Sequence, residues 1–228
     1  MADSHTIDSK LRIDPRLGYA LFDADNHYYE AEDALTRHLP REMRSRGARW
    51  IELNGRKRMM LGEKLFTFVP DPTFGVLGKP GALHDYFACK LDGADVKQAM
   101  GELEASRPEY RDREARLAVM DAQGVGAAWM FPTLAVGIEV AMQPDIPACL
   151  ASLRAFNRWL QEDWGFAWRD RIHAAPAISL SDPAWAIEEV EWCIAQGAKL
   201  VTIRNGPVYT ATGTTSPDSA RSSSSRKA

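Results

Sequence analysis

Cysteine is scarce in this sequence, since 228 residues include only Cys89, Cys149 and Cys193. Three thiols that are far apart and odd in number do not suit a disulfide framework. We therefore expect free, buried thiols that pack as small hydrophobic groups, in a protein of the reducing cytoplasm. Cys193 is expected on a helix and buried, which excludes it as a nucleophile.

Long hydrophobic runs and a strong charge of one sign are also missing. No apolar stretch approaches the ~20 residues that a membrane-spanning helix needs. The N-terminus, MADSHTIDSK, has neither the basic start nor the apolar segment of a signal peptide. The net charge is only -3, so neither nucleic acid nor an anionic membrane is indicated as a partner. Gly-x-Ser-x-Gly, phosphate-binding and dinucleotide-binding motifs are absent as well.

Strands and helices are expected to alternate along most of the chain. Apolar periodicity and capping residues predict strands at 19–25, 126–133, 172–180 and 198–205, and helices at 30–41, 109–123, 145–163 and from Asp182-Pro183 to Gly197. The last helix is expected to carry Ile187, Val190 and Ile194 on one side. This alternation predicts an α/β fold with a parallel sheet and right-handed crossovers.

The chain divides into a polar arm at 1–18, a main domain at 19–209 and a tail at 210–228. Within the domain, residues of about 45–94 are interpreted as an insertion after the first strand. Asn54-Gly55 predicts a β-hairpin there, since both residues tolerate positive φ. We expect the hairpin to cover the site as a lid or to form a dimer contact. The tail is rich in serine and threonine and is expected to be disordered.

The motif FDADNH at 22–27 contains the candidate metal-binding residues. Alternation along a strand places Asp25 and His27 on one side, at the carboxyl end where parallel α/β folds hold their active sites. A carboxylate oxygen and an imidazole nitrogen suit zinc, and manganese is also compatible. Asp23 has two interpretations, either a group that orients a ligand or a strand-end residue that bonds the local backbone.

Four segments in this order resemble the amidohydrolase-related family that includes aminocarboxymuconate-semialdehyde decarboxylase and the resorcylate and carboxyvanillate decarboxylases. The segment from Asp23 to His27 is similar to the family's Asp-x-His-x-His opening, with Asp25 where an acid replaces the first His. The other three are MDAQGVGAAWMFPT at 120–133, FNRWLQEDW at 156–164 and the stretch 170–203. Together the resemblance covers roughly residues 19–209.

The resemblance implies a partial (β/α)8 TIM-type barrel of about the first four β/α units. It implies a metal-dependent hydrolase or non-oxidative decarboxylase that acts on a small carboxylated or cyclic substrate, with Asp25 and His27 as metal ligands. The acid at position 25 favours the decarboxylase branch. Arg204 and Asn205 end the fourth strand, where they either contact an acidic substrate or cap the strand.

The family's remaining ligands, a His after the fifth strand and an Asp after the eighth, have no counterpart here. His5, His38 and His173 are expected to be structural, while His84 in the insertion can lean over the site. A second hypothesis is therefore an inactive truncated fragment or pseudo-enzyme, arising from a reading-frame change near residue 210, with weak metal binding.

Open strand edges follow from a sheet of four strands. Residues such as Leu21, Met130, Ile178 and Val201 are expected to face the barrel interior and to lack their opposing layer. The chain alone is therefore expected to aggregate or to form a homo-oligomer. A dimer of half-barrels would pair the open edges without supplying the family's missing ligands.

Overall fold

The computed structural model describes residues 17–81, 84–89, 103–210 and 213–214. Most of the predicted arm, part of the insertion from residue 90 onward and most of the tail lie outside these residues. None of the helices in the described ranges combines the length and the apolar character that crossing a membrane requires.

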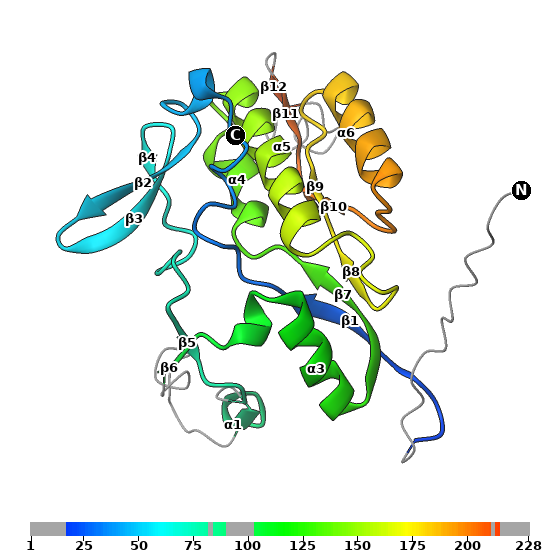
Figure 1. Cartoon of the computed structure of the whole chain (residues 1–228). Coiled ribbons are helices and arrows are strands. Elements are labelled where there is room, and N and C mark those ends of the chain that lie inside the picture. Colours follow the sequence, from blue (N-terminus) through cyan, green and yellow to red (C-terminus); the bar gives the residue numbers. More distant parts are fainter. Residues whose placement is uncertain (1–16, 82–83, 90–102, 211–212, 215–228) are drawn as a thin grey trace, which may run out of the picture.

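Parallel strands form the centre of the fold. β1 (Leu21–His27), β7 (Val125–Phe131) and β8 (Ile172–Ala174) run side by side in this order, and β9 (Ala177–Ile178) pairs with β10 (Thr202–Ile203) (Figure 1). All of these pairs are parallel, which confirms an α/β fold with a parallel sheet.

The predicted strand 172–180 is interrupted at Pro176, which has no N–H to donate to a strand neighbour. On one side the Ala175 N–H donates to the carbonyl of Met130, and on the other the Pro176 carbonyl accepts from the Thr202 N–H. The same chain segment therefore bridges β7 to β10. Four successive strand positions result, namely β1, β7, β8–β9 and β10.

Three helices connect these positions: α3 (Arg113–Gln123), α5 (Ile146–Asp163) and α6 (Pro183–Ala195). Each begins after an aspartate, Asp112, Asp145 or Asp182, whose side chain accepts a hydrogen bond from a backbone N–H in the first turn. α3 starts later than predicted because η2 (Pro108–Tyr110) and the Asp112 cap precede it. A further short helix, α4 (Ala135–Ala141), was not predicted.

A buried ionic network joins α5 and α6. The Glu189 carboxylate is fully buried and pairs with Arg154 at 2.9 Å and with Arg158 at 2.7 Å. Asn157 donates to Glu189 and to the carbonyl of Ala177, and its own oxygen accepts from the Ala177 N–H. The asparagine of the FNRWL segment thus fastens both helices to β9.

The residues on the two faces of the sheet are not buried and exposed as predicted. Met130 and Ile178, expected in a barrel interior, are 0% and 3% exposed and belong to the core shared with the helices. Trp129 lies between two fully buried residues of β7 and is 40% exposed, so it faces the other way. Its ring contacts Phe22 of β1 at 5.3 Å, and Phe22 is also exposed.

The three aliphatic residues that the sequence places on one side of α6 differ in burial. Ile187 and Ile194 are each 61% exposed, Val190 packs partly buried against the core, and Trp185, Glu189 and Cys193 are buried. The helix is apolar on most sides, so periodicity did not distinguish the face that packs. A buried carboxylate with two arginine partners instead fixes which side faces inward.

The predicted helix 30–41 is also wrong. This described stretch contains successive turns closed by short-range bonds such as Ala34 N–H to Ala31 O, followed by η1 (Arg41–Met43). Leu35 and Leu39 are buried. Tertiary packing of these side chains therefore outweighs the helix propensity of the segment.

The hairpin at Asn54-Gly55 is confirmed. β2 (Ala48–Leu53) and β3 (Arg56–Leu61) pair antiparallel, and the two turn residues have φ angles of 53° and 69°. Within the described part of the insertion, the other short elements are β4 (Lys64–Leu65), β5 (Val76–Gly78) and α1 (His84–Phe87). β6 (Leu103–Ala105) lies beyond the predicted insertion and pairs antiparallel with β5.

The tail begins differently from the prediction, because β11 (Tyr209–Thr210) and β12 (Gly213–Thr214) form a short antiparallel pair. Among the thiols, Cys149 and Cys193 are buried as expected, and burial raises the pKa of each to about 12. Cys89 follows α1 with a positive φ and is exposed, so its predicted burial is wrong.

Candidate metal site

Asp25 and His27 lie together at the carboxyl end of β1. The His27 Nε2 atom is 3.8 Å from Asp25 Oδ1, and the two side chains are 49% and 92% exposed. Two donors at this separation and open to solvent can meet one divalent cation. The donor set, one carboxylate oxygen and one imidazole nitrogen, fits part of a zinc or manganese site.

A bulge in β1 shapes this end of the strand. Asp23 pairs with Ala128 and Asn26 with Met130, so three steps along β1 match two along β7. Bulges of this kind re-aim side chains and are frequent next to active sites. The sequence alternation predicted the proximity of Asp25 and His27 but not this irregularity.

Asp23 holds the bulge together. Its Oδ1 accepts from the Asp25 N–H at 3.1 Å and its Oδ2 accepts from the Asn26 side chain at 2.7 Å. The Asn26 oxygen in turn accepts from the His27 N–H at 2.8 Å. Of the two interpretations of Asp23, the bonds observed are those of a residue that bonds the local backbone. They also fix the chain that carries both candidate ligands.

Two buried charged residues beside the site were not singled out from the sequence. Arg116 of α3 donates to the carbonyl of His27 at 3.4 Å, and burial lowers the pKa of its guanidinium. Glu30 is 1% exposed and lies three residues beyond His27. The burial of an acidic residue after a strand has no local signature in a sequence, so Glu30 was not predicted as a site residue.

Glu30 ties the ends of β1 and β7 together. Its Oε1 accepts from the backbone N–H groups of Thr133, Leu134 and Ala135 at 2.9, 2.8 and 3.3 Å. Its Oε2 is buried without a hydrogen-bond partner in the described parts of the chain. Burial is the largest influence on this carboxyl and raises its pKa to about 7, although the three N–H donors oppose the shift.

Arg204 and Asn205 do not share a pocket with the candidate ligands. They line a cavity of about 130 Å³ together with Glu139 of α4 and residues of β9 and β10. Arg204 Nη1 donates to the carbonyl of Pro207 at 2.5 Å, which is a local role at the end of β10. Substrate binding by Arg204 and Asn205 stays a prediction.

His38, His84 and His173 lie away from this pair in the described contacts, and His5 lies outside the described residues. His38 pairs with Glu162 at 2.9 Å, in a turn and not on the predicted helix. His173 stands in register with Trp129 near the start of β8, and burial lowers its pKa. His84 is on α1 and exposed.

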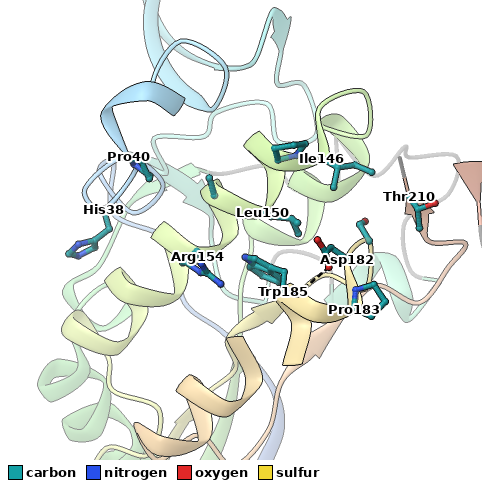
Figure 2. Close-up of a pocket in the computed structure, with 12 residues that line it drawn as sticks. His38, Pro40, Ile146, Leu150, Arg154, Asp182, Pro183, Trp185 and Thr210 are labelled. Atoms are coloured by element: carbon teal, nitrogen blue, oxygen red, sulfur yellow. Dashed lines mark hydrogen bonds between the residues drawn. The ribbon is translucent and has the colours of Figure 1, made fainter. Parts of the chain in front are cut away.

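A larger pocket of about 740 Å³ lies elsewhere, between the N-terminal ends of α5 and α6 (Figure 2). Its polar side chains already have partners: Arg154 pairs with Glu189, and Asp182 caps α6. Ile146, Leu150, Trp185 and two prolines form the apolar part of the labelled lining, which also includes His38 and Thr210. A large volume alone does not identify an active site. The carboxyl end of β1, with Asp25 and His27, therefore remains the candidate site.

No family model and no curated protein matches this chain. Among solved structures, the chain is similar to the crystal structure of an amidohydrolase from Mycobacterium avium subsp. paratuberculosis K-10, with 43% sequence identity and a TM-score of 0.82. The match covers 87% of this chain and 52% of that chain, so this chain spans about half the length of the protein it matches. This likeness in both sequence and fold supports the amidohydrolase family for the chain described here.

Proposed function

We propose that this chain belongs to a metal-dependent amidohydrolase-type enzyme in which Asp25 and His27 bind one divalent cation, zinc or manganese. The observation that carries the proposal is the 3.8 Å pairing of these side chains at the end of β1. The 43% identity to an amidohydrolase supports the same class of chemistry. In this proposal β1, β7, β8–β9 and β10 are the first four strands of a (β/α)8 barrel, and their carboxyl ends form its active-site mouth.

The substrate class in this proposal comes from the family resemblance in the sequence. A bound divalent cation supplies a Lewis acid for hydrolysis or for non-oxidative decarboxylation of a small carboxylated or cyclic compound. Asp25 and His27 hold the cation, and Asp23 with Asn26 fixes the backbone that presents them. The acid at position 25 favours decarboxylation. Among the residues that the structure describes, no group of three or more His, Cys, Asp or Glu side chains could hold a metal ion, so we expect Asp25 and His27 to hold the cation weakly.

Turnover tests the proposal directly. Purified protein supplemented with zinc or manganese is assayed on a panel of small aromatic carboxylates and cyclic amides. Asp25→Asn is expected to lower any metal-dependent kcat/KM by about 100-fold or more, since loss of a directly acting group commonly costs that much. Asp33→Asn, which alters an exposed pair with Arg37, is the control. Metal-dependent turnover that Asp25→Asn leaves unchanged would contradict the proposal.

A further inference from the structure

The small cavity at the carboxyl ends of β9 and β10 combines a buried acid with basic and polar groups. Its volume is about 130 Å³. Glu139 of α4, Thr202 of β10, and Arg204 and Asn205 after β10 are the polar residues that line it. Parallel α/β folds bind their ligands at this end of the sheet. The cavity therefore has the position of a ligand site, separate from the Asp25–His27 pair.

Glu139 supplies a buried carboxylate to this cavity. The residue is 8% exposed. Its Oε1 atom accepts from the hydroxyl groups of Ser179 at 3.0 Å and of Ser181 at 3.3 Å. Its Oε2 atom has no hydrogen-bond or ion-pair partner among the residues that the structure describes. A buried carboxylate is costly without a positive partner, so Glu139 is suited to hold the cationic group of a ligand.

The hydroxyl group of Thr202 is a second polar group of the cavity wall that lacks a partner. Its Oγ1 atom is buried and forms no hydrogen bond within the described parts of the chain. Such groups are rare in native proteins and indicate a partner from outside the chain. Glu139 and Thr202 thus offer two acceptors, and an ammonium group, which has three N–H donors and no acceptor, matches both.

Donors for the opposite charge come from the two residues that follow β10. Arg204 donates through Nη1 to the carbonyl of Pro207, and a guanidinium group has five N–H donors in a planar fork that matches a carboxylate. Asn205 adds a side-chain amide to the same cavity. Apolar side chains, among them Val136 and Ile178, form the remaining wall, which suits the carbon atoms of an organic molecule better than a bare metal ion.

We propose that this cavity binds a small amino acid or a similar zwitterion, with its ammonium group on Glu139 and Thr202 and its carboxylate on Arg204 and Asn205. A cavity of about 130 Å³ is smaller than the pockets that hold drug-sized molecules, so the ligand has few non-hydrogen atoms. The proposal adds a cationic end to the acidic compound expected at Arg204 and Asn205. It does not depend on metal binding by Asp25 and His27.

Calorimetric titration of the full chain with glycine, β-alanine and 4-aminobutyrate tests the proposal. These three probes hold the same two charges at increasing separation. At least one of them is expected to bind saturably. Acetate and methylammonium, which each carry only one of the charges, are expected to bind about 30-fold more weakly or less, because each loses one charged partner.

Two substitutions place the ligand in the cavity. Glu139→Gln removes the charge, keeps an oxygen for Ser179 and Ser181, and is expected to weaken binding about 30-fold or more. Thr202→Val keeps the shape of the side chain, removes only the hydroxyl group, and is expected to weaken binding about tenfold. Glu188→Gln, at a carboxylate of α6 that is 71% exposed, and Thr202→Ser, which retains the hydroxyl group, are the matched controls and should bind as the wild type does.

Circular dichroism checks that each variant is folded, and Thr202→Val decides the outcome if Glu139→Gln does not fold. A wild type that binds none of the three zwitterions saturably would overturn the proposal. Binding that Glu139→Gln and Thr202→Val leave unchanged would overturn it as well, because the ligand would then lie elsewhere. Methylammonium or acetate bound as tightly as the best zwitterion would show that only one charge is recognised, which contradicts a zwitterion site.

Discussion

Replacing Glu189 with alanine is expected to lower the free energy of unfolding by about 3–5 kcal/mol, the cost of removing one partner from a buried ion pair. The Glu189 side chain is fully buried, while its partners Arg154 and Arg158 are 40% and 25% exposed. The substitution leaves both guanidinium groups, and the Asn157 amide, without their shared acceptor. It also opens a cavity between α5 and α6.

Glu188 provides a matched control one residue away. Its side chain is 71% exposed and its contact with Arg154 is 3.4 Å long. Glu188→Ala is therefore expected to change the free energy of unfolding by less than about 0.5 kcal/mol. Urea denaturation of the three proteins measures both values. Equal effects of the two alanine substitutions would show that the buried network does not hold α6 to α5.

Stability is expected to fall as the pH rises from about 4.5 to about 7, because of Glu30. Burial raises the folded-state pKa of this carboxyl from 4.5 to about 7, so within this window the folded chain keeps a proton that the unfolded chain has lost. The contribution is complete below the unfolded pKa and is lost as the pH passes the folded pKa. A shift of this size corresponds to about 3 kcal/mol.

Glu30→Gln isolates this contribution. Glutamine keeps an oxygen for the N–H groups of Thr133, Leu134 and Ala135 and cannot ionise. The difference in unfolding free energy between wild type and variant is expected to change by about 3 kcal/mol between pH 4.5 and pH 8. Glu32→Gln, at a half-exposed residue paired with Lys57, is the control. A wild type and Glu30→Gln variant with parallel pH profiles would contradict the buried, raised-pKa carboxyl.

Structural features that depend on residues close together in the sequence were predicted from local sequence signals. Asp145 and Asp182 mark helix starts because their side chains satisfy N–H groups two or three positions later. Asn54-Gly55 predicts its hairpin because few other residues tolerate positive φ at both turn positions. The proximity of Asp25 and His27 followed from strand alternation in the same way.

Features decided by distant residues were not predictable from these signals. Glu30 becomes a buried acceptor only because residues 133–135 present their N–H groups to it. The inward side of α6 depends on Arg154 and Arg158, about 30 positions earlier in the chain. Likewise, the burial of Met130 and the exposure of Trp129 depend on which face of the sheet the helices cover.

Calorimetric titration with zinc and with manganese, comparing the wild type with His27→Ala, tests most directly whether Asp25 and His27 form a metal site. The wild type is expected to show saturable binding of one class of site. His27→Ala is expected to weaken that binding at least about tenfold, since it removes one of the two donors identified at this site. His38→Ala, which removes a surface pair with Glu162, is the control and should bind as the wild type does. Tight binding that His27→Ala leaves unchanged would contradict the account.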